Sequence, residues 1–212
     1  MNLPDIAAIR TDYVRAGLVE SDLDPSPTVQ IKKWVADAVA AGHPEPTAMA
    51  LATVSASGEP SNRIVLLKGV DDGLVFFTNY ESAKGKDLAA NPRAAATLFW
   101  VLLERQIRVV GSVTKVTRAE SEDYFRSRPY ESRIGAWASA QSTVLADRAT
   151  LEQKVAALKT QYPDDVPLPP FWGGYRLIPD RVELWQGRPS RLHDRLQYTR
   201  TPPTWHLTRL SP

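Results

Sequence analysis

From Ala48 onward, short runs of aliphatic and β-branched residues alternate with turn signals, and this pattern limits the fold more than any other feature. Two turn signals, S-A-S-G-E-P and D-D-G, separate three of these runs, Met49–Val54, Arg63–Lys68 and Leu74–Thr78. This arrangement predicts a meander of three antiparallel strands. We expect further strands at Ala94–Trp100, Arg105–Lys115, F-W-G-G-Y-R-L, R-V-E-L-W-Q and Trp205–Leu210. Seven or eight antiparallel strands with intervening helices indicate a mainly β (α+β) protein, a β-barrel with peripheral helices.

Helical periodicity and capping residues predict the helices between these strands. Ser82 precedes the first turn of one of them, and Thr117 with Glu120 forms a capping box for another. The predicted helices are Ile6–Ala16, a second that starts after Ser26-Pro27 and ends at Gly42, Ser82–Ala90, Thr117–Arg128, Glu131–Ala140 and Asp147–Tyr162.

Composition excludes several classes of function. A length of 212 residues suits a single domain, here 1–212, in which residues 1–45 form a helical N-terminal extension. With a net charge of +2 and no basic run, we expect no nucleic-acid partner. We also expect no membrane span or signal peptide, and therefore a cytoplasmic protein. The chain has no cysteine and its three histidines lack ligand spacing, so we expect no metal, and any redox chemistry must come from a bound organic cofactor.

A short segment near the C-terminus, W-Q-G-R-P-S-R-L-H-D-R from Trp185 to Arg195, concentrates charge beside a turn. If the segment is extended, Arg191, His193 and Arg195 alternate and share one face. That face would carry two fixed cations beside a group that titrates near neutral pH. The alternative is a solvated strand edge.

Other residues suggest sites for anions. Arg63 and Lys68 bracket four aliphatic residues, and they either reach solvent or hold anionic groups. Lys84 in the first turn of a helix favours a bound phosphate there. Tyr124 and Arg128 lie four residues apart on a helix and Ser132 follows, a set that either forms a phosphate pocket or lies on the surface. Gln106 suits the edge of a heterocycle, although an edge-strand position also explains an amide. Taken alone, the pair Arg10 and Tyr13 indicates a contact on the protein surface.

Six motifs occur in the order found in the pyridoxine/pyridoxamine 5'-phosphate oxidase family, which the chain resembles from Arg10 to the terminal R-L-S-P. They are R-I-V-L-L-K, F-F-T-N-Y-E-S-A-K, L-E-R-Q-I-R-V-V-G, Y-F-R-S-R-P-Y-E-S-R-I-G-A-W-A-S-A-Q-S, F-W-G-G-Y-R and W-Q-G-R-P-S-R-L-H-D-R.

The resemblance implies a split β-barrel that binds FMN in the groove between the subunits of a homodimer. It implies flavin contacts from Arg63, Ile64, Val65, Leu66, Leu67, Lys68, Phe77, Thr78, Ala83, Lys84, Gln106, Gln141, Ser142, Trp185 and Arg195, several of them supplied by the partner chain. It implies substrate contacts from Lys68, Tyr124, Arg128 and Ser132 to the phosphate, from Arg191, Leu192 and His193 to the ring, and from Arg10 and Tyr13 as a lid.

The implied reaction oxidises pyridoxamine or pyridoxine 5'-phosphate to pyridoxal 5'-phosphate, with O2 as the electron acceptor and H2O2 as product. We expect Arg191 to orient the substrate and stabilise charge, and His193 to donate a hydrogen bond or transfer a proton. The alternatives are another FMN oxidase of this fold, such as the phenazine-biosynthesis type, and a non-catalytic flavin or pyridoxal-phosphate binding protein.

The sequence departs from the family pattern at two positions. Ala83 stands where an arginine is common, and without a substitute this costs about 1 to 3 kcal/mol of FMN binding. Arg63 or Arg93 could replace it. Leu184 in place of the usual aromatic residue is a milder change.

Overall fold

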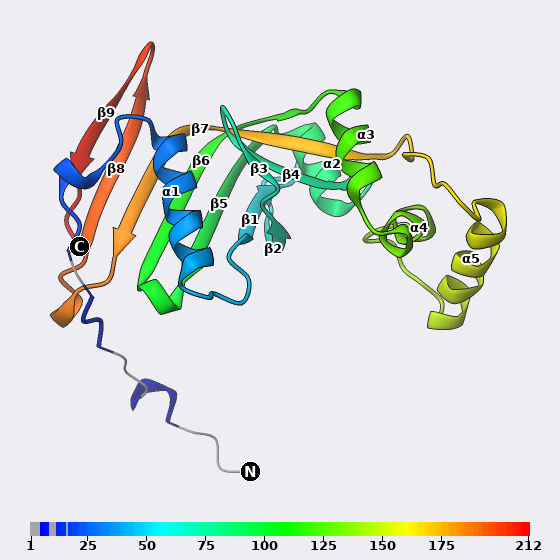
Figure 1. The fold of residues 1–212 in the computed structure, drawn as a ribbon, viewed down its shortest axis with the longest axis horizontal. Coiled ribbons are helices and arrows are strands. Elements are labelled where there is room, and N and C mark those ends of the chain that lie inside the picture. The colour runs from blue at the N-terminus through cyan, green and yellow to red at the C-terminus, as the bar shows by residue number, and fades with distance from the viewer. Residues whose placement is uncertain (1–4, 9–11, 16) are drawn as a thin grey trace. The chain divides into compact units, whose positions relative to one another are not determined.

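The computed structural model describes residues 5–8, 12–15 and 17–212. Among these residues, nine strands pair into a single sheet (Figure 1). The strands are β1 (Ala48–Val54), β2 (Pro60–Leu66), β3 (Gly69–Val70), β4 (Leu74–Asn79), β5 (Arg93–Trp100), β6 (Arg105–Lys115), β7 (Trp172–Gln186), β8 (Asp194–Thr201) and β9 (Thr204–Arg209). The prediction of an antiparallel β protein with helices is confirmed.

Five α-helices and four 3-10 turns accompany the strands in the described part of the chain. The helices are α1 (Pro27–Ala40), α2 (Ala83–Ala90), α3 (Arg118–Ser127), α4 (Tyr130–Ala138) and α5 (Arg148–Gln161), and the turns are η1 (Ile6–Ala8), η2 (Glu20–Asp22), η3 (Val101–Leu103) and η4 (Pro189–Arg191). Of these, η1, η2 and α1 precede the first strand.

The capping residues begin the helices where the sequence predicts. Ser82 accepts a hydrogen bond from the Gly85 amide, and Thr117 and Glu120 form the reciprocal capping box at the start of α3. The predicted helix Ile6–Ala16 is wrong in its described part. Only Ile6–Ala8 forms a short 3-10 turn, and residues 12–15 are irregular, because their amides bond to a distant carboxylate instead of to the preceding turn.

The predicted three-strand meander is also wrong in its third strand. β1 and β2 pair antiparallel, with Leu51 opposite Arg63. β4 instead pairs with the two-residue β3 and with β7, because the turn Asp71–Gly73 joins β3 directly to β4. In hydrogen-bond order the strands run β2-β1-β5-β6-β7-β4-β3, and β8 pairs with β7 and β9.

Contacts divide the chain into two compact units. One unit comprises the described residues up to Pro46, Thr97–Val109 and Asp180–Pro212, and the other comprises Thr47–Ala96 and Val110–Pro179. Because the boundary falls inside β5, β6 and β7, each of these strands contributes residues to both units.

The first unit has a core around α1, β8 and the end of β5. Ile31 and Ala38 of α1 are completely buried, and Trp34 is nearly so. Tyr198 is buried and its hydroxyl donates to the Asp24 carbonyl at 2.6 Å.

The second unit has its own core around Trp172 of β7. Phe125 of α3 and Ile134 of α4 pack with Trp172, Val166 and Leu168. Helices α4 and α5 lie side by side next to this cluster (Figure 1). In the described part of the chain, no helix is both long and apolar enough to cross a lipid bilayer.

Candidate functional site

A cavity of about 740 Å3 opens in the second unit, among β2, β4, α2, α3 and α4. It is large enough for a drug-sized ligand. The cavity is lined by Arg63, Ile64, Val65, Leu66, Lys68, Phe77, Thr78, Asn79, Ala83, Lys84, Tyr124, Arg128, Ser132, Gly135, Ala136, Ser139, Gln141, Ser142 and Trp172. Four of these residues are cationic, and none of the described lining residues is acidic. The lining therefore favours an anionic ligand.

Lys84 lies at one part of this cavity, in the first turn of α2. Its amine is 2.9 Å from Gln141 Oε1 and 3.2 Å from Thr78 Oγ1, to both of which it donates. Burial of the side chain and, second, the neighbouring Arg63 guanidinium lower the pKa of Lys84. Because the described partners of this cation are hydroxyl and amide oxygens and include no carboxylate, a bound anion would relieve the cost of burying it.

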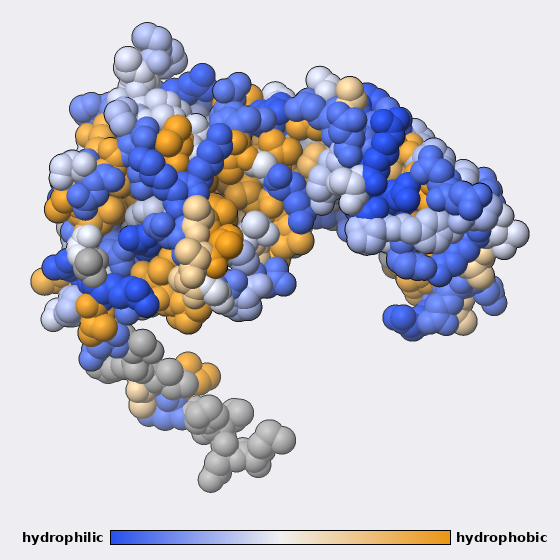
Figure 2. Space-filling view, in the orientation of Figure 1, coloured by the Kyte–Doolittle hydropathy of each residue, from blue (hydrophilic) through white to orange (hydrophobic). Residues whose placement is uncertain are grey.

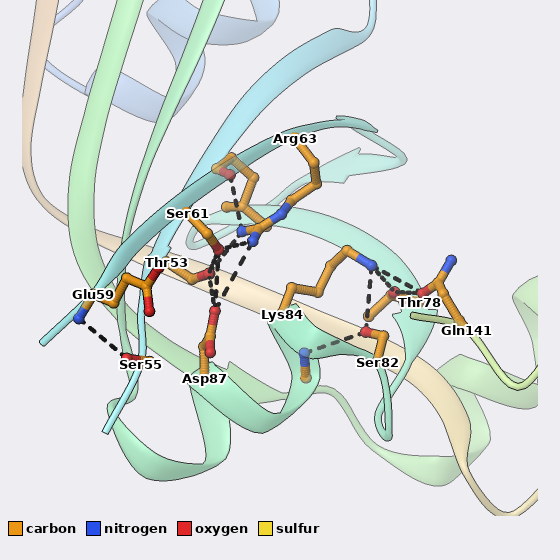
Figure 3. A network of polar contacts seen from close by, with 12 residues as sticks. Thr53, Ser55, Glu59, Ser61, Arg63, Thr78, Ser82, Lys84, Asp87 and Gln141 are labelled. Carbon is orange, nitrogen blue, oxygen red and sulfur yellow. Dashed lines mark hydrogen bonds and ion pairs between the residues drawn. The ribbon is translucent and has the colours of Figure 1, made fainter. Parts of the chain in front are cut away.

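Arg63 of β2 is held beside Lys84 by a network of hydroxyl groups (Figure 3). Its guanidinium donates to Thr53 Oγ1 at 2.6 Å, to the Leu51 carbonyl at 3.1 Å and to Ser61 Oγ. Asp87 of α2 accepts from Thr53 Oγ1 at 2.6 Å and lies 3.9 Å from the guanidinium. Burial lowers the pKa of Arg63, and Asp87 opposes that shift.

Arg128, the C-cap residue directly after α3, marks a second cationic part of the cavity. Its guanidinium lies 4.7 Å from the centre of the Trp172 ring. Its Nη1 atom is buried and has no hydrogen-bond partner in the described structure. Desolvation lowers the pKa of Arg128, against the effect of Tyr124. An unpartnered buried guanidinium nitrogen in a cavity fits a ligand that accepts hydrogen bonds.

Tyr124, Ser132 and Lys68 line the same cavity as Arg128. The Tyr124 ring stacks on Phe77 with the ring centres 4.0 Å apart. The structure therefore brings together in one cavity all four side chains that the sequence suggested for the substrate phosphate.

The segment that follows β7 carries a second group of site candidates, in the first unit. The prediction that Arg191, His193 and Arg195 share one face of a strand is wrong, because β8 begins only at Asp194. Ser190 and Arg191 take left-handed backbone angles, with φ of 58° and 61°, and fold the segment into η4. Arg191 and Leu192 are exposed on this turn.

His193 packs against two aromatic rings. The ring centre of Trp185 is 4.6 Å from that of His193, and the centre of Tyr13 is 5.8 Å away. The Arg188 amide donates to His193 Nδ1 at 3.1 Å, which leaves Nε2 as the protonated nitrogen of the neutral ring. Burial and, second, the charge of Arg191 lower the pKa of His193. The imidazole is therefore a neutral hydrogen-bond donor near pH 7.

Glu104 holds Tyr13 in this cluster. Its carboxylate accepts from the Val14 and Arg15 amides, both at 3.0 Å, and its carbonyl accepts from the Gly187 amide at 2.7 Å. A side chain at Gly187 would collide with the Tyr13 ring, so the absence of a Cβ there makes room for it. Glu104 itself is left-handed, with φ of 54°.

Arg195 and Gln106 lie elsewhere in the first unit. Arg195 donates to the buried Glu183 carboxylate at 2.8 Å, and Arg108 pairs with the same carboxylate at 3.2 Å. Gln106 is half-buried on β6 beside the fully buried Ile107.

The resemblance implied two further site residues, Leu67 and Arg10. The Leu67 side chain is buried and does not line the cavity. Arg10 lies outside the described residues.

Sequence reasoning missed several residues that matter for the geometry. The missed cavity-lining residues are Trp172, Asn79, Gly135, Ala136 and Ser139. Sequence reasoning also missed Thr53 and Asp87, which form part of the network around Arg63, and Glu104, which binds the Tyr13 segment. Nothing in the sequence pairs Thr53 with Asp87, which lies 34 residues away.

Comparison with known proteins identifies the family. Residues 35–162 match the model of the pyridoxamine 5'-phosphate oxidase family, and residues 172–212 match the pyridoxine 5'-phosphate oxidase C-terminal dimerisation region. The chain belongs to the pyridoxamine 5'-phosphate oxidase family. A relative named pyridoxine/pyridoxamine 5'-phosphate oxidase, from Burkholderia multivorans, is 58% identical over 98% of this chain and 99% of its own length.

Two solved structures extend the comparison. PhzG from Burkholderia lata, in complex with tetrahydrophenazine-1-carboxylic acid, is 34% identical, covers 91% of this chain and 95% of its own, and superposes with a TM-score of 0.86. A pyridoxamine 5'-phosphate oxidase-related, FMN binding protein from Nostoc punctiforme shares the fold at 19% identity, with a TM-score of 0.72 over 90% of this chain and 100% of its own.

FMN is the cofactor that this oxidase family uses, and the cavity fits it. The region around Lys84 and Arg63 offers one buried and one half-buried cation, with hydroxyl groups, to a phosphate, and aliphatic residues of β2 offer a surface to a flat ring. Ala83 lines the cavity where the family arginine is missing, and Arg63 lines the same cavity.

Proposed function

We propose that this chain is an FMN-dependent oxidase that converts pyridoxamine 5'-phosphate and pyridoxine 5'-phosphate to pyridoxal 5'-phosphate, with O2 as acceptor and H2O2 as product. The observation that carries the proposal is the second cationic part of the cavity. FMN has one phosphate, for which Lys84 and Arg63 suffice. The separate set around the unpartnered Arg128 Nη1 then serves a second phosphate, which a B6 phosphate has.

Each group has a role in this proposal. FMN would be held by Lys84, Arg63, Thr78, Gln141 and Ser142. The substrate phosphate would be held by Arg128, Tyr124, Ser132 and Lys68. The chemistry that FMN supplies when bound is the acceptance of a hydride from the substrate and reoxidation by O2. Fixing the phosphate places the exocyclic carbon of the pyridine ring for this chemistry.

Arg191 and His193 would act on the substrate ring. His193 donates from Nε2, because Nδ1 already accepts the Arg188 amide. Arg191 provides a fixed positive charge that orients the substrate. The Tyr13 ring contacts the imidazole edge-on, with the ring centres 5.8 Å apart. We also propose that Trp185, Arg195 and Gln106 contact the flavin, as the resemblance implies.

We propose that the active form is a homodimer in which FMN lies at the subunit interface and that residues 1–212 are one flavoprotein domain. The match of residues 172–212 to a dimerisation region supports the dimer. Apolar side chains are exposed on β2, where Ile64 is 66% and Leu66 is 41% accessible. Apolar residues also reach the surface elsewhere on the face shown in Figure 2. A partner subunit would remove such surface from water.

A second candidate, a phenazine-type oxidase, is favoured by the similarity to PhzG. The ligand named for that protein is a carboxylic acid without a phosphate. The two candidates therefore make different demands on Arg128, because only the B6 substrate brings a phosphate dianion to it.

A peroxide assay tests the proposal. Purified protein is supplied with FMN, and H2O2 is measured with pyridoxamine phosphate, pyridoxine phosphate and unphosphorylated pyridoxamine. We expect turnover with the two phosphates and very little with pyridoxamine. Equal rates with and without the phosphate group would favour the phenazine-type candidate, and a yellow protein without turnover on any of them would show a binding protein.

A further inference from the structure

The Arg63 guanidinium is bound along one side by three oxygen acceptors. Nη1 donates to the Leu51 carbonyl and to Thr53 Oγ1, and Nη2 donates to Ser61 Oγ (Figure 3). These contacts use both N–H groups of Nη1 and one of Nη2. In the part of the chain that the structure describes, Nε–H and the second N–H of Nη2 therefore remain for a ligand.

Asp87 determines which way the hydroxyl groups point. A hydroxyl has one proton to donate, and a carboxylate can only accept. Thr53 Oγ1 donates to Asp87 Oδ2 at 2.6 Å, and Ser61 Oγ donates to the same oxygen at 3.3 Å. Both hydroxyl oxygens then have lone pairs left to face Arg63. The Thr53 side chain is buried, with 1% of the residue accessible, so water does not compete for this bond.

We propose that Asp87 is a positioning residue for Arg63, and that through Thr53 and Ser61 its carboxylate holds the guanidinium in the orientation that binds the flavin phosphate. This inference rests on the proposed function, because it needs FMN in the cavity.

The sequence of α2 makes this arrangement important in this chain. With Ala83 as the first residue of the helix, α2 provides Lys84 but no guanidinium to the cavity. Lysine presents a point charge, whereas an arginine can form two parallel bonds to a phosphate if its plane is fixed. Arg63 is the guanidinium beside Lys84, and Asp87, three residues after Lys84 on the same helix, fixes its plane.

If only the charge of Asp87 is considered, removal of Asp87 is expected to strengthen FMN binding, which is the opposite of what a positioning role predicts. A carboxylate 3.9 Å from Arg63 partly neutralises that cation and repels a phosphate nearby. If Asp87 acted by charge alone, its neutralisation would tighten FMN binding. If Asp87 positions Arg63, its neutralisation weakens FMN binding. The sign of the change distinguishes the two.

The experiment compares FMN with riboflavin, which has the same ring and no phosphate. The full-length protein is freed of flavin and titrated with each ligand while flavin fluorescence is followed, for the wild type, Asp87→Asn, Thr53→Val and Thr53→Ser. We expect Asp87→Asn and Thr53→Val to raise the Kd for FMN about three- to tenfold. The Kd for riboflavin should stay within about twofold, and Thr53→Ser, which keeps the hydroxyl, should restore FMN binding.

Asp71→Asn is the matched control, because Asp71 pairs with Arg176 away from the cavity lining. It should leave both constants unchanged. Ser61→Ala, at an exposed residue, repeats the test if the buried Thr53→Val variant fails to fold. Unchanged or tighter FMN binding in Asp87→Asn would overturn the inference, and so would an equal loss for both flavins. Failure of the wild type to bind FMN would instead overturn the proposed function.

Discussion

The cavity and the Arg188–His193 turn differ in what holds their charged groups. In the cavity, Lys84 and Arg128 lie on or at the end of capped helices, and Lys84 is buried with three side-chain partners. In the turn, Arg191 is exposed on a left-handed residue, and His193 is held by one backbone amide and two aromatic rings.

This difference indicates two separate tasks. Groups on rigid elements are pre-organised and contribute to binding, because little entropy is lost when a ligand arrives. A turn that stores backbone strain is typical of segments where reacting groups are placed. We therefore expect substitutions in the cavity to change affinity and substitutions in the turn to change turnover.

The largest expected effect is that of Arg191→Ala. In the proposed function Arg191 is a fixed cation next to the reacting ring, and its removal should lower kcat for pyridoxamine phosphate by about 100- to 1,000-fold. The Kd for FMN should not change, because Arg191 neither lines the cavity nor is among the other residues to which we assign flavin contacts. Steady-state peroxide assays and flavin titration measure the two quantities. A normal kcat would show that turnover does not depend on the turn.

In contrast to Arg191→Ala, Arg128→Ala should change substrate binding and leave turnover almost unchanged. Loss of a buried charge-assisted contact should raise KM for pyridoxamine phosphate about 10- to 100-fold and leave kcat within a few fold. Arg126→Ala is the matched control, because Arg126 lies on the same helix, is 65% exposed and pairs only with Glu122 and Asp123 in the described structure. A loss of kcat without a change in KM would contradict the division of tasks.

Glu104 tests whether the Tyr13 segment belongs with the turn. Glu104→Gly removes the carboxylate that binds the Val14 and Arg15 amides but tolerates the left-handed backbone. If the segment belongs with the turn, kcat should fall by about three- to tenfold with little change in KM, and proteolysis before Leu18 should become faster. Glu104→Gln, which keeps an acceptor, should lose less. Equal behaviour of Glu104→Gly and the wild type would show that the carboxylate does not hold the segment.

The smallest effect is on the pH profile. Burial and Arg191 lower the pKa of His193 below its ordinary value of 6.5, so the neutral form is present above that lowered pKa and is lost as the pH falls through it. The acid limb of kcat/KM should therefore lie below pH 6.5. Arg191→Gln removes one cause and should move the limb toward higher pH. A limb that does not move in this variant would assign it to another group.

Local sequence signals predicted the elements correctly where neighbours in the chain determine them. Ser82 and Thr117 begin helices because their side chains bond amides three residues later. The same local reasoning failed at Arg191–His193, where Pro189 and two left-handed residues replace the expected strand.

The sequence by itself determined that the chain forms antiparallel strands with capped helices, and it contained the family motifs and the residue types that suit phosphates. The tertiary structure alone decided that Lys84 meets Gln141, 57 residues away, that Asp87 reaches Thr53, and that β4 pairs with β7 instead of β2. The physical reason is the separation along the chain over which each interaction acts. Capping and periodicity act within a few residues, whereas the pairing of buried charges and hydroxyls depends on which distant strands and helices pack together.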